Sequence, residues 1–163
     1  MSQGLEDNIF QKALTNIGES NNADSVRNIM ANTKDQLARG LLSLQQAEAM
    51  NRAGLRRLAA LAGQDANDTL TRRWLEGIAA FEELTGKTAT RTRPMLQRHG
   101  ARRAFEKLVD RKSGTSGFEQ MIEAGLHDMT AEWIVLEFKE IFDERIREFA
   151  ERRLSEAGVE KRP

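Results

Sequence analysis

Only two prolines, Pro94 and Pro163, interrupt this chain of 163 residues. Apolar side chains recur at intervals of three and four along most of its length, a spacing that places them on one face of an α-helix. Abundant Ala, Leu, Glu and Arg also favour helices over strands. The sequence therefore predicts an all-α fold, a single compact bundle of about eight helices.

Apolar spacing divides the first part of the chain into three expected helices. Residues 5–17 predict the first, and Asp24 or Ser25 is expected to cap the second. A longer helix is expected over residues 41–62, where the apolar residues form a stripe that suits either core packing or a dimer seam. The stripe consists of Leu44, Ala47, Gly54, Leu58 and Leu61.

Glycine and proline mark the expected helix ends in the second part of the chain. Asp68 is expected to cap a helix that ends at Gly86, and a loop is expected before Pro94, which suits a first helical turn. This next helix should break at Gly100. Residues 101–109 then match the helical spacing more closely than any other segment.

The remaining segments complete the expected organisation. Residues 113–117 predict a small flexible loop, a helix begins at Phe118, and Ile146 to Leu154 mark the last helix. Asn, Gln and Thr are frequent near the N-terminus, so the first helices could form an arm or an oligomerisation element. The sequence thus predicts three parts of the chain: the N-terminal helices over residues 1–40, a helical core domain over residues 41–157 and a frayed tail over residues 158–163.

Composition excludes several classes of protein. The chain has no cysteine, so disulfides, thiolate metal sites and cysteine nucleophiles are absent. Residues 1–10 lack the basic start and apolar run of a secretion signal, and no apolar run is long enough to span a membrane. We therefore expect a cytoplasmic protein without membrane contact, and no motif indicates a small-molecule cofactor.

Charge is arranged by position in a chain whose formal net charge is zero. Residues 87–112 contain nine basic residues and two acidic ones, a local charge of +7, whereas residues 113–163 contain seven basic and twelve acidic residues, a local charge of −5. A local excess of positive charge favours an anionic partner. The acidic C-terminal region could instead lie against the basic segment and neutralise part of it.

The basic residues are the candidate binding residues. On a helix over residues 101–109, the apolar side chains face the core; they are Ala101, Phe105, Leu108 and Val109. Three basic side chains spaced four residues apart then point outward, namely Arg103, Lys107 and Arg111. Nucleic acid, an acidic protein surface and self-neutralisation all remain open. Two short helices around Gly100 invite comparison with a helix-turn-helix, but that alignment would bury Glu106. The candidates are Arg91, Arg93, Arg98, Arg102, Arg103, Lys107 and Arg111.

Motifs for catalysis are incomplete. Asp128, followed by Glu137 and Lys139 at the end of an apolar, strand-like run, resembles the spacing of metal-dependent nucleases, which need a multi-stranded sheet. The alternative is a buried helix or short extended segment. Glu123 and His127 share the spacing of a two-ligand metal contact but lack a third ligand, so no metal site is predicted.

Several short motifs after residue 91 resemble a known group of proteins. They are Thr92-Arg93-Pro94-Met95 with Arg98-His99-Gly100, Ser116-Gly117-Phe118, Glu123-Ala124-Gly125-Leu126, Val135-Leu136 and Ile141-Phe142. Residues 91–154 resemble a helical C-terminal segment of uncharacterised bacterial proteins, some of which look associated with mobile or defence-related gene neighbourhoods. The resemblance implies a bacterial origin and one structural unit over residues 117–142, and it brings no catalytic or ligand-binding residue.

Together these observations predict a non-enzymatic helical binding or adaptor protein that acts through protein–protein interaction. Its partner is expected to be another protein or a second copy of the chain, as in a homo-oligomer. The alternative is a nucleic-acid-binding protein that uses residues 87–112, and a metal-dependent nuclease is a third possibility. A nucleic-acid-binding protein would require the basic residues for phosphate contacts, whereas a nuclease would require a β-sheet to hold its metal ligands.

Overall fold

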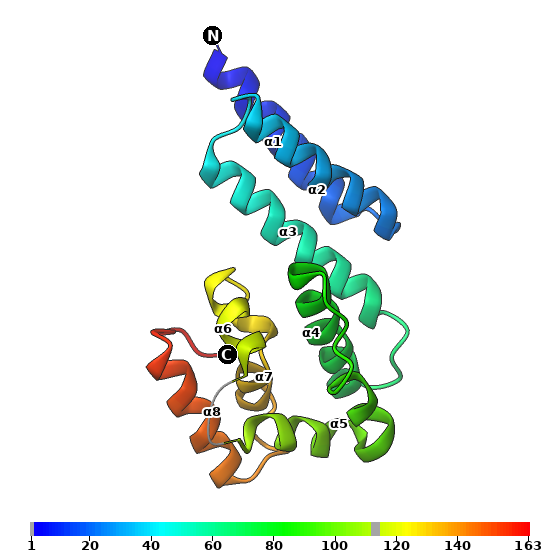
Figure 1. Cartoon of the computed structure of the whole chain (residues 1–163), viewed down its shortest axis with the longest axis vertical. Coiled ribbons are helices and arrows are strands. Elements are labelled where there is room, and N and C mark those ends of the chain that lie inside the picture. Colours follow the sequence, from blue (N-terminus) through cyan, green and yellow to red (C-terminus); the bar gives the residue numbers. More distant parts are fainter. Residues whose placement is uncertain (1, 112–114) are drawn as a thin grey trace. The chain divides into compact units, whose positions relative to one another are not determined.

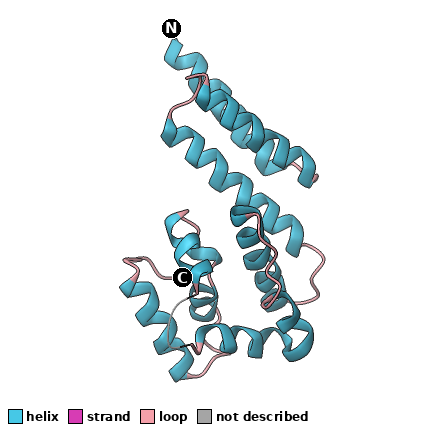
Figure 2. Ribbon diagram, in the orientation of Figure 1, coloured by secondary structure: helices cyan, strands magenta, loops and turns pink. Residues whose placement is uncertain are grey.

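A computed structural model describes the backbone of residues 2–111 and 115–163. Within these ranges it forms eight α-helices, one short 3-10 helix and no β-strand, which confirms the all-α prediction (Figure 1, Figure 2). None of the described helices has both the length and the apolar character that a membrane span requires. The elements are α1 (Ser2–Glu19), α2 (Ala23–Ala38), α3 (Leu44–Gly63), α4 (Thr69–Thr85), α5 (Arg93–Val109), α6 (Ser116–Glu123), η1 (His127–Met129), α7 (Ala131–Glu137) and α8 (Glu144–Glu156).

The contacts within the chain define two units, Met1–Leu61 and Ala62–Pro163. This division falls near the end of α3, whereas the sequence predicted a boundary after residue 40. The reason is that most of α3 belongs to the first unit. Its residues Met50 and Leu58 are buried in one apolar cluster with residues of α1 and α2.

The first unit packs α1, α2 and most of α3 around a small core. The buried residues of its main apolar cluster are Ile17, Val26, Leu42, Met50 and Leu58. Its helix caps differ from the prediction, because Asn22 and not Asp24 or Ser25 is the N-cap of α2. The Asn22 side-chain oxygen accepts hydrogen bonds from the Asp24 and Ser25 amides at 2.9 and 3.1 Å, so both predicted caps lie in the first helical turn.

Helix α3 begins at Leu44, three residues later than expected. Ser43 and Gln46 cap it reciprocally: the Ser43 amide donates to the Gln46 side chain at 2.9 Å, and the Gln46 amide donates to the Ser43 hydroxyl at 3.1 Å. Leu44 is 64% exposed, so this member of the apolar stripe takes no part in the core of the first unit. Ala47 and Leu58 of that stripe are buried as predicted.

The second unit contains α4 to α8 around an aromatic core. The Trp74 and Phe105 rings meet edge to face with 5.0 Å between centroids, and the Phe105 and Phe142 rings do so at 6.2 Å. Local signals had located its helix ends correctly. Asp68 accepts a hydrogen bond from the Thr71 amide at 2.8 Å, and Gly86 ends α4 in the left-handed region with φ +67°.

Two other segments of this unit differ from the sequence prediction in the type or the start of their helix. The apolar run that looked strand-like forms helix α7, which Thr130 caps by accepting from the Trp133 amide at 3.3 Å. Helix α6 begins at Ser116, with Thr115 as its N-cap, rather than at Phe118. Of the loop expected over residues 113–117, residues 113 and 114 lie outside the described part of the chain.

The C-terminal residues after Gly158 are not helical, but the chain folds back along α8. Arg162 donates to the Glu151 carboxylate at 2.7 and 2.8 Å and to the Ser155 hydroxyl at 2.8 Å. A tail without such contacts would fray. These bonds hold the segment that the sequence analysis expected to be frayed against the last helix.

Candidate functional site

The seven predicted binding residues lie on helix α5 and its two flanks. Arg91 precedes the helix and Arg111 follows it, and all seven side chains are exposed. The predicted inward face is also present, since Ala104, Phe105 and Val109 are buried. Gly100, with φ +75°, bends α5 as the sequence predicted. The apolar half of the segment is therefore core, and its basic half faces outward.

Two of the seven residues form ion pairs within the second unit. Arg93 binds Glu82 of α4 through two nitrogens, and Arg102 binds Glu106 one turn further along α5 at 3.0 Å. Burial raises the pKa of Glu82, but hydrogen bonds from Arg93 and the Ala89 amide outweigh it, so the net pKa is lowered. These two arginines therefore have structural roles that limit their availability for a partner.

The other cations have no acidic partner within residues 2–111 and 115–163. Lys87, Arg91, Arg98, Arg103 and Lys107 make no ion pair there. The Arg111 side chain donates only to the Lys107 carbonyl oxygen, at 3.4 Å. These side chains therefore stay available to an anionic partner in solution.

The expected neutralisation by the acidic C-terminal region does not take the form of direct ion pairs. In the part of the chain that the structure describes, no acidic side chain of α8 binds a cation of residues 87–111. The ion pair that does form joins a basic residue of α8 to an acidic residue of the basic segment. Arg145 of α8 donates to the Asp110 carboxylate at 2.7 and 3.1 Å, and so engages one of the two acids of the basic segment.

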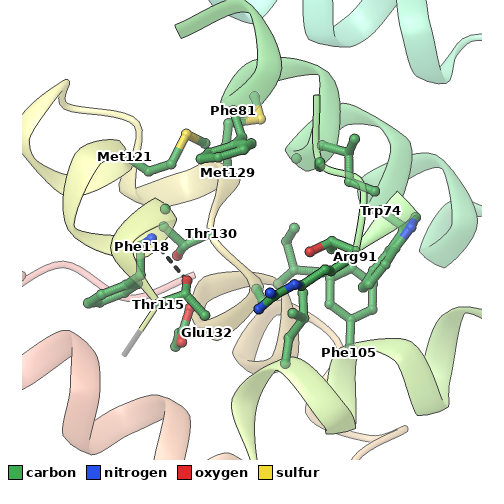
Figure 3. Close-up of a pocket in the computed structure, with 18 of the residues that line it drawn as sticks. Trp74, Phe81, Arg91, Phe105, Thr115, Phe118, Met121, Met129, Thr130 and Glu132 are labelled. Atoms are coloured by element: carbon green, nitrogen blue, oxygen red, sulfur yellow. Dashed lines mark hydrogen bonds between the residues drawn. The ribbon is translucent and has the colours of Figure 1, made fainter. Parts of the chain in front are cut away.

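A cleft of about 320 Å³ opens beside these cations, within the second unit. Its walls come from α4, α5, α6 and α7, and its mouth carries Lys87, Arg91 and Arg111. Figure 3 shows the Arg91 side chain extending across the cleft in the direction of Thr115 and Glu132. The large apolar side chains of the walls are Trp74, Phe81, Phe105, Phe118, Met121 and Met129.

Two glycines in the cleft wall allow helices to approach closely. A Cβ atom on Gly77 of α4 would lie 2.9 Å from the Met129 carbonyl oxygen, and one on Gly117 of α6 would lie 3.0 Å from the Phe81 ring. The first neighbour is backbone and cannot easily move. Gly77 therefore sets the distance between α4 and η1, and Gly117 sets the width of the cleft beside Phe81.

A buried ion pair lies below the cleft mouth. Arg153 of α8 binds the Glu132 carboxylate of α7 at 2.9 Å, and the two side chains are only 8% and 5% exposed. Arg153 also donates to the Leu108 carbonyl oxygen at 3.4 Å and to the Arg111 carbonyl oxygen. Burial raises the pKa of Glu132, against the lowering by its own amide and by Arg153. This pair ties α7 and α8 to the end of α5, where Arg111 lies.

Sequence reasoning missed this pair, although one signal was present. Arg153 follows Ile146 by seven residues and Ala150 by three, so it continues the apolar face of α8. A charged residue in that position indicates a buried partner. Nothing local indicated that Glu132 would be this partner.

The residues of the nuclease-like motif are joined through Arg73 of α4 instead of along a strand. Arg73 donates to the Glu137 carboxylate at 3.0 Å, to the Asp128 carbonyl oxygen at 2.7 Å and to Glu76 at 2.7 Å. Burial lowers the pKa of Arg73, but these two carboxylates raise it by more. Lys139 is exposed beyond the end of α7. The Glu137 carboxylate is thus part of an ion-pair network that positions α7.

The possible metal-ligand pair is not brought together with further ligands. The His127 ring packs edge to face on Trp133 with 5.0 Å between centroids, while Glu123 is exposed at the end of α6. Among the described residues, no three acidic or histidine side chains are grouped closely enough to hold a metal ion. His127 therefore contributes to packing beside the cap of α7.

Comparison with known proteins adds no relative. No protein-family model matches the chain, and searches of curated proteins and of solved structures likewise found no match. The function of the chain is therefore inferred from the charge, burial and geometry of its own side chains.

Proposed function

We propose that the protein is a non-enzymatic binding or adaptor protein that docks an acidic protein surface on helix α5. We call the exposed, unpaired cations of this helix, Arg98, Arg103 and Lys107, the cationic face; Arg91 precedes the helix and Arg111 follows it. The supporting observation is that these cations are exposed and lack an acidic partner within the described residues, although the chain as a whole is neutral. Such a field steers and orients an oppositely charged partner.

The surroundings of the cationic face favour a protein partner over nucleic acid. Arginine, aromatic residues and methionine are the types enriched at protein–protein interfaces. The partly exposed Phe81, Phe118 and Met129 line the cleft that Arg91 and Arg111 border. Single-stranded nucleic acid is usually held by exposed aromatic rings on which bases stack. Phe105, the one Phe, Tyr or Trp of residues 87–112, is 2% exposed.

Charge reversal tests this proposal. In Arg103→Glu/Lys107→Glu, affinity for a fluorescein-labelled peptide of alternating Glu and Leu should fall by about tenfold or more, because attraction becomes repulsion. Fluorescence anisotropy at low salt measures the affinity of each protein for the peptide. The control Arg152→Glu/Lys161→Glu makes the same change in net charge on exposed residues outside α5, and should bind like the wild type. If a DNA duplex bound more tightly than the peptide, with a steep salt dependence, the nucleic-acid alternative would be correct instead.

We further propose that the chain associates with a second copy through its first unit. Leu41 and Leu44, before and at the start of α3, are 50% and 64% exposed, an apolar pair that a partner copy would cover. Light scattering at micromolar concentration should give the dimer mass for the wild type and the monomer mass for Leu41→Asp/Leu44→Asp. A wild type of monomer mass would contradict this proposal.

A further inference from the structure

The cleft of the second unit has the size and wall chemistry of a ligand site. Its volume of about 320 Å³ is at the lower end of the range for small-molecule pockets. Trp74, Phe105, Met121 and Ile134 line it and are each at most 3% exposed, so its floor is formed by the core itself. Such walls favour an apolar occupant over water.

The uncompensated charge around the cleft is positive. Lys87, Arg91 and Arg111 at its mouth form no ion pair with the described residues. The one acid in its lining, Glu132, is bound to Arg153, and the lining residue Arg73 is bound to Glu76 and Glu137. The charges of Glu132 and Arg153 cancel, and Arg73 with its two carboxylates sums to −1. The three unpaired cations outweigh this single negative charge, so the mouth attracts a negative group.

Polar groups at the mouth can also orient such a group. The Arg91 side chain extends across the cleft toward Thr115 (Figure 3). The Thr115 hydroxyl oxygen accepts from the Phe118 amide at 3.2 Å, while its own O–H has no acceptor among the described residues. An arginine that extends toward a hydroxyl can bind one carboxylate or sulfonate together with it, through charge-assisted hydrogen bonds.

We propose that this cleft binds a small apolar molecule that carries one anionic group. Its apolar body lies against Trp74, Phe81 and Phe105, and its anionic group binds Arg91 at the mouth, with Thr115 as a second donor. A medium-chain fatty acid or an aromatic acid has this chemistry. This site lies beside the cationic face, and it does not depend on the partner proposed for that face.

A pair of fluorescent dyes tests the proposal on the full chain. Anilinonaphthalene sulfonate carries an anionic group, and N-phenylnaphthylamine is nearly the same apolar molecule without it. In a Trp133→Phe background, where Trp74 is the remaining tryptophan, the sulfonate dye should bind, quench Trp74 by energy transfer and be displaced by decanoate more readily than by decanol. The neutral dye should bind about tenfold more weakly, because it lacks the hydrogen bonds to Arg91.

Three variants locate the site. Arg91→Gln should lower the affinity for the sulfonate dye by about tenfold and leave the affinity for the neutral dye unchanged. Gly117→Ala should lower the affinity for both dyes, because the added methyl group meets the Phe81 ring in the cleft wall. Arg98→Gln removes the same charge outside the cleft and should change neither. The proposal is overturned if the sulfonate dye does not bind, if both dyes bind equally, or if Arg91→Gln, shown by circular dichroism to be folded, binds like the wild type.

Discussion

Replacing Arg153 with alanine should destabilise the protein by about 3–5 kcal/mol, because Glu132 would remain buried without its partner. The Glu132 and Arg153 side chains are 5% and 8% exposed, so the Glu132 carboxylate is shielded from bulk solvent. The carbonyl oxygens of Leu108 and Arg111 would also lose a donor. Equilibrium unfolding in urea, followed by circular dichroism, measures the change.

Two further variants separate this effect from the loss of any arginine on α8. Arg145→Ala breaks an ion pair with Asp110 whose side chains are 63% and 40% exposed, and should cost no more than about 1 kcal/mol. The double variant Glu132→Met/Arg153→Met should recover most of the stability, because no buried charge is then unpaired. If Arg153→Ala and Arg145→Ala were equally stable, the buried pair would not have the role described here.

Phe105→Ala should have the second large effect, a loss of about 3–5 kcal/mol, because it removes a buried aromatic ring from the centre of the second unit's core. Its ring contacts those of Trp74 and Phe142, at centroid distances of 5.0 and 6.2 Å. Urea unfolding followed by Trp fluorescence reports this directly, since Trp74 is one of the two neighbours.

Phe149→Ala is the matched comparison on α8. That ring is half-buried, with the guanidinium groups of Arg145 and Arg152 at 5.2 and 5.0 Å, so its removal should cost only about 1–2 kcal/mol. A larger loss for Phe149→Ala than for Phe105→Ala would show that the core of this unit is centred elsewhere.

Several helix ends were predictable from local signals. The Asp68 cap, the left-handed Gly86 and the bend at Gly100 each depend on a few neighbouring residues, and all three are present in the structure. Residues 133–139 were ambiguous, because a short apolar run suits a buried strand or a buried helix equally. In the structure this run is helical as far as Glu137, and Thr130 is the N-cap of its helix.

The candidate site was predictable as a set of residues but not as a geometry. Spacing on α5 correctly separated the inward Phe105 from the outward basic residues. Which cations are paired depends on contacts between distant segments, such as Arg145 with Asp110, that no local pattern contains. The cleft was missed because an apolar residue such as Phe81 has the same spacing whether it fills a core or lines a cavity.

The account depends most on the cationic face of α5 being open to an anionic partner. The most direct measurement is the affinity of the acidic peptide for the wild type and for Arg103→Glu/Lys107→Glu, compared at low salt on proteins shown to be equally stable. We predict binding to the wild type and a loss of about tenfold or more in the variant. Equal affinities, or no binding to either protein, would contradict the account.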